Sequence, residues 1–97
     1  MPSYRVTMTI GLLHRGVNPS TVLPAAGAAA AELTEVEAQD LTVVAGQPRI
    51  VVRYVAEHDD QARDVAGRVI GEVTGLAQVS ASVVTRREGA RWLPVTA

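Results

Sequence analysis

The sequence predicts an α+β domain with the element order βαββαβ, and three observations support this expectation. The first is strict alternation of apolar and polar residues from Tyr4 to Leu12, which is typical of a half-buried strand. The second is a pair of helical patterns, one rich in alanine and one with apolar residues three and four positions apart. The third is a turn containing Gly46 and Pro48 between two strand-like segments, which forces antiparallel pairing.

The length of the chain fits one domain over residues 1–97, because 97 residues can bury a single hydrophobic core but not two. With 47% hydrophobic and 20% charged residues and a net charge of −1, the chain is of ordinary globular composition. The absence of cysteine excludes disulfides, thiolate metal sites and thiol nucleophiles. The start of the chain lacks a signal-peptide pattern, so we expect a cytoplasmic, soluble protein.

Each predicted element has a local justification. In the first strand, one side of the sheet is expected to carry Tyr4, Val6, Met8, Ile10 and Leu12. Proline fits a helix only in its first turn, so the first helix is predicted over Pro24 to Leu33. In the next predicted strand, the apolar residues switch from one set of alternate positions to the other. A bulge near Gln39 and Asp40 would account for this switch. The strand after the turn at Gly46, Gln47 and Pro48 is expected to bury Ile50, Val52, Tyr54 and Ala56.

The second helix has the clearest pattern in the chain. Asp59 or His58 can cap its start, where acidic residues interact favourably with the helix dipole. Gly67 and Gly71 lie four residues apart and suggest a strip where a neighbour packs closely. The last strand is predicted to place Val79, Ala81 and Val83 on one side, followed by a turn at Glu88 and Gly89 and a short extension through Trp92 to Val95.

This layout resembles the ferredoxin-like superfold, a two-layer sandwich with a four-stranded antiparallel sheet and two helices on one face. A short C-terminal strand extension would be added to it. Because the superfold hosts many unrelated activities, the resemblance implies no function by itself.

The uncovered face of the sheet is the predicted interface. A mixed surface of threonine, valine and arginine fits a solvated sheet or half of an isologous dimer, and we favour the dimer. Relatives in the superfold pair through sheet faces, as in dimeric α+β barrel proteins, or edge to edge, as in ACT-like domains. The residues assigned to the interface are Thr7, Thr9, Val51, Arg53, Val55, Ser82 and Val84.

A candidate ligand site lies in the loop after the first strand. His14 and Arg15, with the amides of the following turn, could bind a carboxylate or phosphate, although Asn18 before Pro19 also fits a simple cap. Trp92 is the further candidate for this site, or for holding the C-terminal segment against the body. The phosphate-loop signature of the acylphosphatases is not matched.

The sequence predicts no cofactor and no metal site. The histidines His14 and His58 show no paired ligand spacing, and acidic residues beside His58 are explained by the helix start. The composition argues against nucleic acid as a partner, because the pI is about 6.1 and only three residues are aromatic.

We therefore expect a non-catalytic homodimeric binding or regulatory module, with a small molecule or a protein as its partner and no membrane association. Whether the protein is an enzyme stays open. The alternative is a cofactor-free enzyme that resembles the antibiotic-synthesis monooxygenases among the dimeric α+β barrel proteins, with a pocket near His14, Arg15 and Trp92. A weak RNA-binding domain using Arg86 and Arg87 is the third possibility.

Overall fold

The structure, a computed structural model, describes residues 1–95. It contains two α-helices, one short 3₁₀ turn and five strands. Their bounds are β1 (Ser3–Leu13), η1 (Pro19–Thr21), α1 (Val22–Ala31), β2 (Val36–Val44), β3 (Gln47–Val55), α2 (Asp59–Thr74), β4 (Ala77–Glu88) and β5 (Arg91–Pro94). Within residues 1–95, neither helix is long and apolar enough to cross a lipid bilayer.

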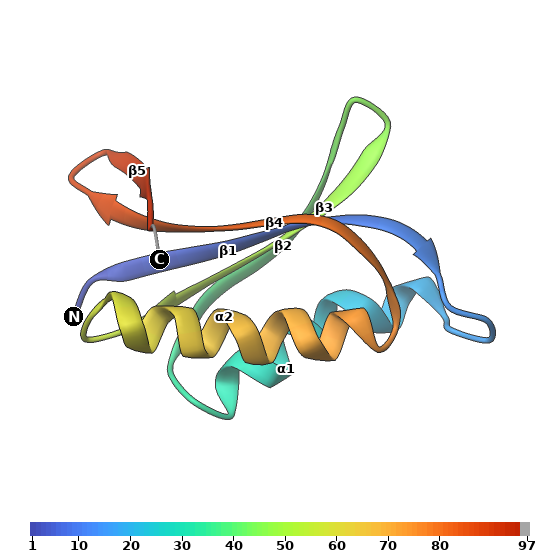
Figure 1. Ribbon diagram of the computed structural model, residues 1–97, viewed down its shortest axis with the longest axis horizontal. Coiled ribbons are helices and arrows are strands. Elements are labelled where there is room, and N and C mark those ends of the chain that lie inside the picture. The colour runs from blue at the N-terminus through green and yellow to red at the C-terminus, as the bar shows by residue number, and fades with distance from the viewer. Residues whose placement is uncertain (96–97) are drawn as a thin grey trace.

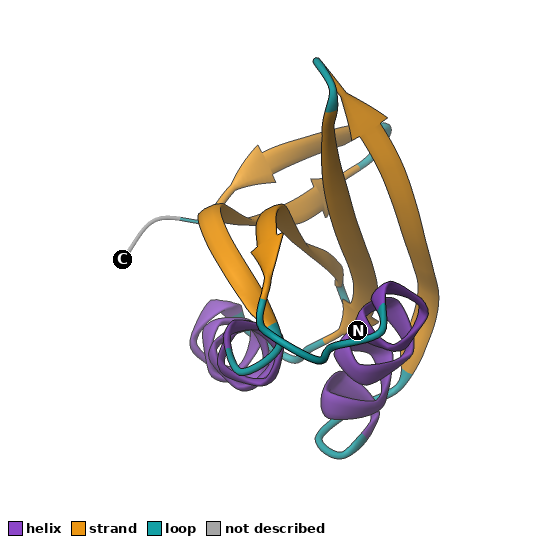
Figure 2. Ribbon diagram, turned by 90° about the vertical axis from the view of Figure 1, so that its right-hand side faces the viewer, coloured by secondary structure: helices purple, strands orange, loops and turns teal. Residues whose placement is uncertain are grey.

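The five strands form one sheet in the order β2-β3-β1-β4-β5, and every neighbouring pair is antiparallel. Both helices lie side by side on one face of this sheet (Figures 1 and 2), α1 against β2 and β3 and α2 mainly against β4. The predicted α+β class, the antiparallel sheet and the two helices on one side are confirmed. Within residues 1–95 the sheet has five strands instead of four, because β5 pairs with β4 from Arg91 to Pro94.

The core lies between the sheet and the helices. Tyr4 of β1 stacks on Tyr54 of β3, with ring centroids 6.1 Å apart, at one end of this layer. Small residues on the helices, such as Ala26 and Ala66, let the backbones approach the sheet closely. The buried residues contributed by the two central strands are Tyr4, Val6, Met8, Ile10, Ile50, Val52 and Tyr54, as the alternation predicts.

The alternation of β1 stops before the strand ends. Ile10 pairs with Val79 but Leu13 pairs with Ala77, so β1 holds one extra residue in this interval. The bulge turns Leu12 away from the core, and 75% of Leu12 is exposed. The expectation that Leu12 continues the buried side is therefore wrong.

A second bulge reverses the predicted faces of β4. Thr9 pairs with Ala81 and Ile10 with Val79, which leaves Ser80 as the extra residue in β4. Beyond this bulge, Val84 lies opposite the buried Val6.

As a result Ser82 and Val84 belong to the helix side of the sheet, and the prediction that they lie on the uncovered face is wrong. Ser80 is the bulge residue itself, and Arg86 lies opposite the buried Tyr4. The uncovered face carries Ala81, Val83 and Thr85 instead, opposite Thr9, Thr7 and Arg5.

The β2–β3 hairpin also differs in detail from the expectation. Its bulge is at Glu37 rather than near Gln39 and Asp40, because Val36 pairs with Tyr54 and Ala38 with Arg53. The turn consists of Ala45 and Gly46, both with positive φ, and Val44 pairs with Gln47. This is the backbone conformation of a two-residue hairpin loop, so Gln47 and Pro48 belong to β3.

The helices begin close to the predicted positions. Asn18 caps η1, since its side chain accepts a hydrogen bond from the Ser20 amide, and α1 follows from Val22 rather than from Pro24. His58 caps α2 by accepting from the Gln61 amide. The predicted close packing at Gly67 and Gly71 is not present within residues 1–95, where no atom outside the surrounding backbone of α2 comes within 4 Å of a Cβ added at either position.

Candidate functional site

The uncovered face of the sheet is concave. Both the β2–β3 hairpin and the β4–β5 hairpin bend away from the helices (Figure 1), so the sheet curls around this face. The strand register places Val51 at its centre, with Asp40 of β2 on one side and Thr7 of β1 on the other. The neighbouring row consists of Arg53 and Arg5, which lie directly opposite each other.

Trp92 of β5 reaches over this row of arginines. The guanidinium of Arg5 lies 3.9 Å from the centre of the indole ring, and that of Arg53 lies 5.3 Å from it. Both contacts are within the range of cation–π attraction. Trp92 therefore covers part of the sheet face and fixes the orientation of the Arg5 side chain.

Arg53 is neutralised by a carboxylate. Its Nε donates to Glu37 at 3.1 Å, and the Ser3 hydroxyl donates to the same carboxylate oxygen at 2.6 Å. The Ser3 hydrogen bond, together with Arg53, holds the pKa of Glu37 below its ordinary value. Glu37 is therefore a fixed negative charge that belongs to Arg53.

Three other charged groups on this face have no such partner among residues 1–95. Arg5 contacts the Trp92 ring but no carboxylate, and Asp40 contacts no cation. The Nε of Arg49, opposite Thr9, is buried and makes no hydrogen bond within the described chain. Unpaired charges on one concave surface are a feature of binding sites, because a ligand can satisfy them.

A pocket of about 340 Å³ lies on this face. This volume falls within the range of small-molecule pockets. Its lining comes from three adjacent strands and consists of Arg5, Thr7, Ala38, Asp40, Thr42, Val51 and Arg53.

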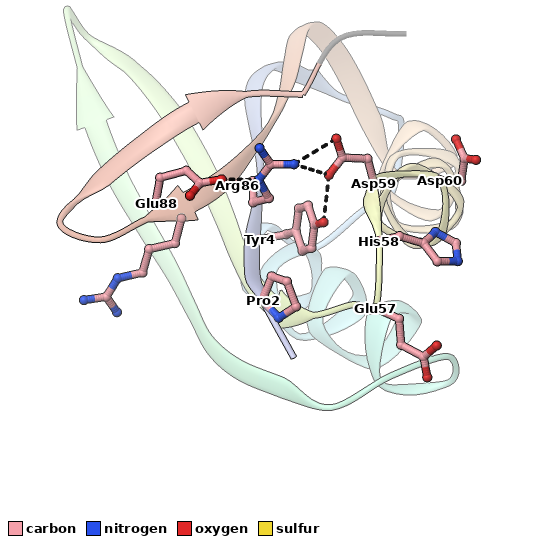
Figure 3. Close-up of a pocket in the computed structure, with 9 residues that line it drawn as sticks. Pro2, Tyr4, Glu57, His58, Asp59, Asp60, Arg86 and Glu88 are labelled. Atoms are coloured by element: carbon pink, nitrogen blue, oxygen red, sulfur yellow. Dashed lines mark hydrogen bonds and ion pairs between the residues drawn. The ribbon is translucent and has the colours of Figure 1, made fainter.

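A larger hollow, of about 790 Å³, lies at the start of α2 (Figure 3). Here the Tyr4 hydroxyl donates to Asp59 Oδ1 at 2.8 Å, and Arg86 donates to both oxygens of the same carboxylate at 2.8 and 3.1 Å. The Nε of Arg86 also donates to Glu88. These bonds connect the first turn of α2 to β1 and β4.

The electrostatics of this cluster indicate a structural role. The Tyr4 hydrogen bond, together with Arg86, lowers the pKa of Asp59, whereas burial and the nearby Asp59 raise the pKa of Tyr4. Asp59 is thus a weak base whose acceptors are already engaged, and Tyr4 stays protonated. Neither group is prepared to transfer a proton at neutral pH.

A third hollow, of about 540 Å³, lies between the start of α1 and the β2–β3 hairpin. Its lining is largely apolar and includes Leu13, Val22, Leu23, Leu41 and Ile50. Leu41 belongs to the outer strand β2, so this groove opens beside the edge of the sheet.

The four predicted ligand residues do not come together. His14, Arg15 and Asn18 lie in the loop after β1, whereas Trp92 lies on β5 at the opposite end of the molecule (Figure 1). The His14 ring is 3.2 Å from the Gly75 carbonyl, and Asn18 is the cap of η1. The loop therefore acts as a connection between β1 and α1, and Trp92 belongs to the concave face.

Five of the seven predicted interface residues do share the uncovered face. Thr7, Thr9, Val51, Arg53 and Val55 occupy alternate positions of β1 and β3, in agreement with the predicted strands. Their use as an interface stays a prediction.

Sequence reasoning missed Asp40, Arg49 and Glu37 as members of the concave face. The only signal for them was the alternation of β2 and β3, and the bulge at Glu37 obscures it in β2. Among the described residues, no group of three or more histidine or acidic side chains is placed to hold a metal ion. Comparison with protein-family models, curated proteins and solved structures found no match to this chain.

Proposed function

We propose that this protein is a non-catalytic homodimeric binding module with a ferredoxin-like arrangement, extended by β5. The order β2-β3-β1-β4 of the first four strands and the two helices on one face support the ferredoxin-like assignment. The observation that carries the dimer is the outer edge of β2, with which no strand of residues 1–95 pairs.

The β2 edge is long and apolar. Leu41, Val43 and Val44 are exposed by 53%, 67% and 41%, and they occupy three of the last four positions of a nine-residue strand. Soluble monomers usually protect such edges with charged residues, proline or a bulge. The first half of β2 has the bulge at Glu37 and the charge of Asp40, but the segment from Leu41 to Val44 has none of these features. An edge of this kind favours pairing with another strand.

The hairpin register identifies the backbone groups that are free to pair. Pro48 has no N–H, and it lies opposite Val43, in agreement with a position where the two strands exchange no hydrogen bond. The hydrogen-bonding pairs alternate along an antiparallel ladder. The N–H and C=O groups of Val43, Leu41 and Gln39 therefore point outward, away from β3.

An antiparallel pairing of β2 with β2 of a second copy, centred on Leu41, uses these outward-pointing backbone groups. It places Leu41 opposite the partner's Leu41 and Gln39 opposite the partner's Val43, which is the isologous pattern of a twofold dimer. Asp40 then faces Thr42 of the partner subunit. A register centred on Asp40 would place two carboxylates opposite each other, which is unfavourable. The apolar groove beside Leu41 lies at the same edge and would be partly covered.

The uncovered face is a poorer dimer surface than this edge. Its charges include the partly buried Arg5 and Arg49, and twofold pairing of the faces would bring these cations together. The two hairpins that bend over this face also leave no flat surface (Figure 1).

Light scattering during gel filtration tests the dimer. We expect about twice the chain mass of 10.2 kDa for the wild type at micromolar concentration. Leu41→Lys should elute as a monomer with an unchanged circular dichroism spectrum, because the side chain lies at the strand edge. The matched control is Val83→Lys, which changes an exposed valine on β4 and should stay dimeric. A monomeric wild type, or a dimeric Leu41→Lys variant, would refute the proposal.

A further inference from the structure

The pocket at the centre of the concave face shares strand β2 with the proposed dimer edge but has its own chemistry. Val51 forms its floor, the hydroxyls of Thr7 and Thr42 lie on opposite sides, and Arg5 and Asp40 provide charge. The three strands that build it, β1, β2 and β3, are hydrogen-bonded neighbours in the sheet. The pocket is therefore a preformed hollow rather than a gap between loops.

The charges of the pocket are not neutralised internally. Arg53 is paired with Glu37, but within residues 1–95 neither Arg5 nor Asp40 has an ionic partner. The cluster around Asp59 is the opposite case, since Tyr4 and Arg86 occupy its carboxylate. A pocket whose cation and anion both lack partners offers complementary charges to a ligand.

The contact with Trp92 makes Arg5 a better anion-binding group. The indole ring covers one side of the guanidinium at 3.9 Å, which removes water from that side and holds the side chain in place. The N–H groups at the rim of the guanidinium stay available for an anion, and a fixed guanidinium loses less entropy on binding. Arg53, at 5.3 Å from the same ring, is paired with Glu37, so Arg5 is the cation of this pair that is left for an anion.

We infer that this pocket binds a small organic anion, through a carboxylate or phosphate group at Arg5, and that the other end of the ligand donates hydrogen bonds to Asp40. One strand, β3, lies between Arg5 on β1 and Asp40 on β2, so a ligand must be several bonds long to reach both. The hydroxyl of Thr7 lies beside the path between them, and Thr42 lies next to Asp40 on the side away from Arg5. The pocket volume of about 340 Å³ restricts the ligand to small molecules.

Titration with three probes tests this inference. Inorganic phosphate and succinate compare the two anion chemistries, and 4-aminobutyrate combines a carboxylate with an ammonium group that Asp40 can accept. Trp92 is the only tryptophan, so its fluorescence reports on the Arg5 contact, and amide shifts of Thr7, Asp40 and Val51 in NMR spectra report on the pocket. We expect both signals to saturate at low salt.

Variants identify the groups responsible. Arg5→Gln should weaken binding of every bound probe by about tenfold, because it removes a charge-assisted hydrogen bond. Asp40→Asn should weaken 4-aminobutyrate by a similar factor but not succinate. The matched control Arg15→Gln removes the same charge from the exposed loop at the other end of the molecule and should leave binding unchanged.

Two results would overturn the inference. One is the absence of any saturable change, in fluorescence and in amide shifts, up to about 10 mM of each probe. The other is equal weakening by Arg15→Gln and Arg5→Gln, which would show attraction by overall charge alone. The same titration on the Leu41→Lys variant separates this site from the proposed dimer, because Leu41 faces the helix side of the sheet and does not line the pocket.

Discussion

The two faces of the sheet share the same strands but use charge in different ways. On the helix side, Arg86, which lies on β4 opposite Tyr4, is bound to Asp59 and Glu88. On the concave side, Arg5 and Arg49 have no carboxylate partner within residues 1–95. Paired charges at the margin of a core hold elements together, whereas unpaired charges on a hollow surface are available to a ligand.

The two faces should differ most in how much adjacent residues of β1 contribute to stability. Met8 is fully buried on the helix side, and Met8→Ala should lower the free energy of unfolding by about 2–5 kcal/mol through lost burial and a cavity. Thr7→Ala, one residue away on the concave side, should change it by less than about 1 kcal/mol. Urea denaturation at one fixed protein concentration measures both. Equal losses would mean that the concave face is also a buried core.

Removing a buried hydroxyl should destabilise the protein less than removing a whole buried side chain. The Tyr54 hydroxyl is buried and donates to the Ala62 carbonyl at 2.7 Å, so Tyr54→Phe should cost about 1–2 kcal/mol in urea denaturation. Tyr4→Phe is the matched control, because the Tyr4 ring is also buried but its hydroxyl donates to the partly exposed Asp59.

The Tyr54→Phe variant should also change how the protein unfolds at alkaline pH. Burial raises the pKa of Tyr54 above its ordinary value of 10.0. The folded protein therefore keeps this hydroxyl protonated while the unfolded chain ionises, and stability falls as the pH rises above 10. Tyr54→Phe should show a flatter alkaline limb, and an unchanged limb would contradict the burial of this hydroxyl.

A helix position that packs against neither the sheet nor the other helix should tolerate an added methyl group. Gly67 lies within α2 with nothing within 4 Å of a built Cβ, so Gly67→Ala should raise the free energy of unfolding by up to about 1 kcal/mol through helix propensity. Gly27 of α1 is the matched control, because a Cβ there would overlap the Gln39 side chain and offset the gain. Thermal denaturation compares the two. Destabilisation by Gly67→Ala would indicate a neighbour packed on α2.

The smallest expected effect concerns acid stability at the start of α2. Since the Tyr4 hydroxyl and Arg86 lower the pKa of Asp59, its contribution to stability is present above the ordinary value of 3.8 and is lost as the pH falls through the folded-state pKa. Asp59→Asn should therefore be less stable than wild type at neutral pH, and the difference should shrink in acid. Asp64→Asn, an exposed change on the same helix, is the control in a titration followed by circular dichroism. A difference that persists unchanged at low pH would contradict the ionic role of Asp59.

The sequence by itself determined which segments become helices and strands. The alternation in β1 and β3 and the spacing of three and four in α2 depend on neighbouring residues only, and they identified the buried side of the central strands correctly. The Asn18 and His58 caps were recognisable for the same reason.

Only the tertiary structure decided which residues meet on the concave face. The bulges at Ser80 and Glu37 each insert one residue, and a shift of one residue moves the following side chains to the other face. That is why Ser82 and Val84 were assigned to the wrong side. Trp92 likewise has no local pattern that predicts Arg5 as its neighbour, because they are 87 positions apart in the chain and meet only when β5 curls over the sheet. Such contacts depend on the paired strands as a whole, and no segment of the chain encodes them alone.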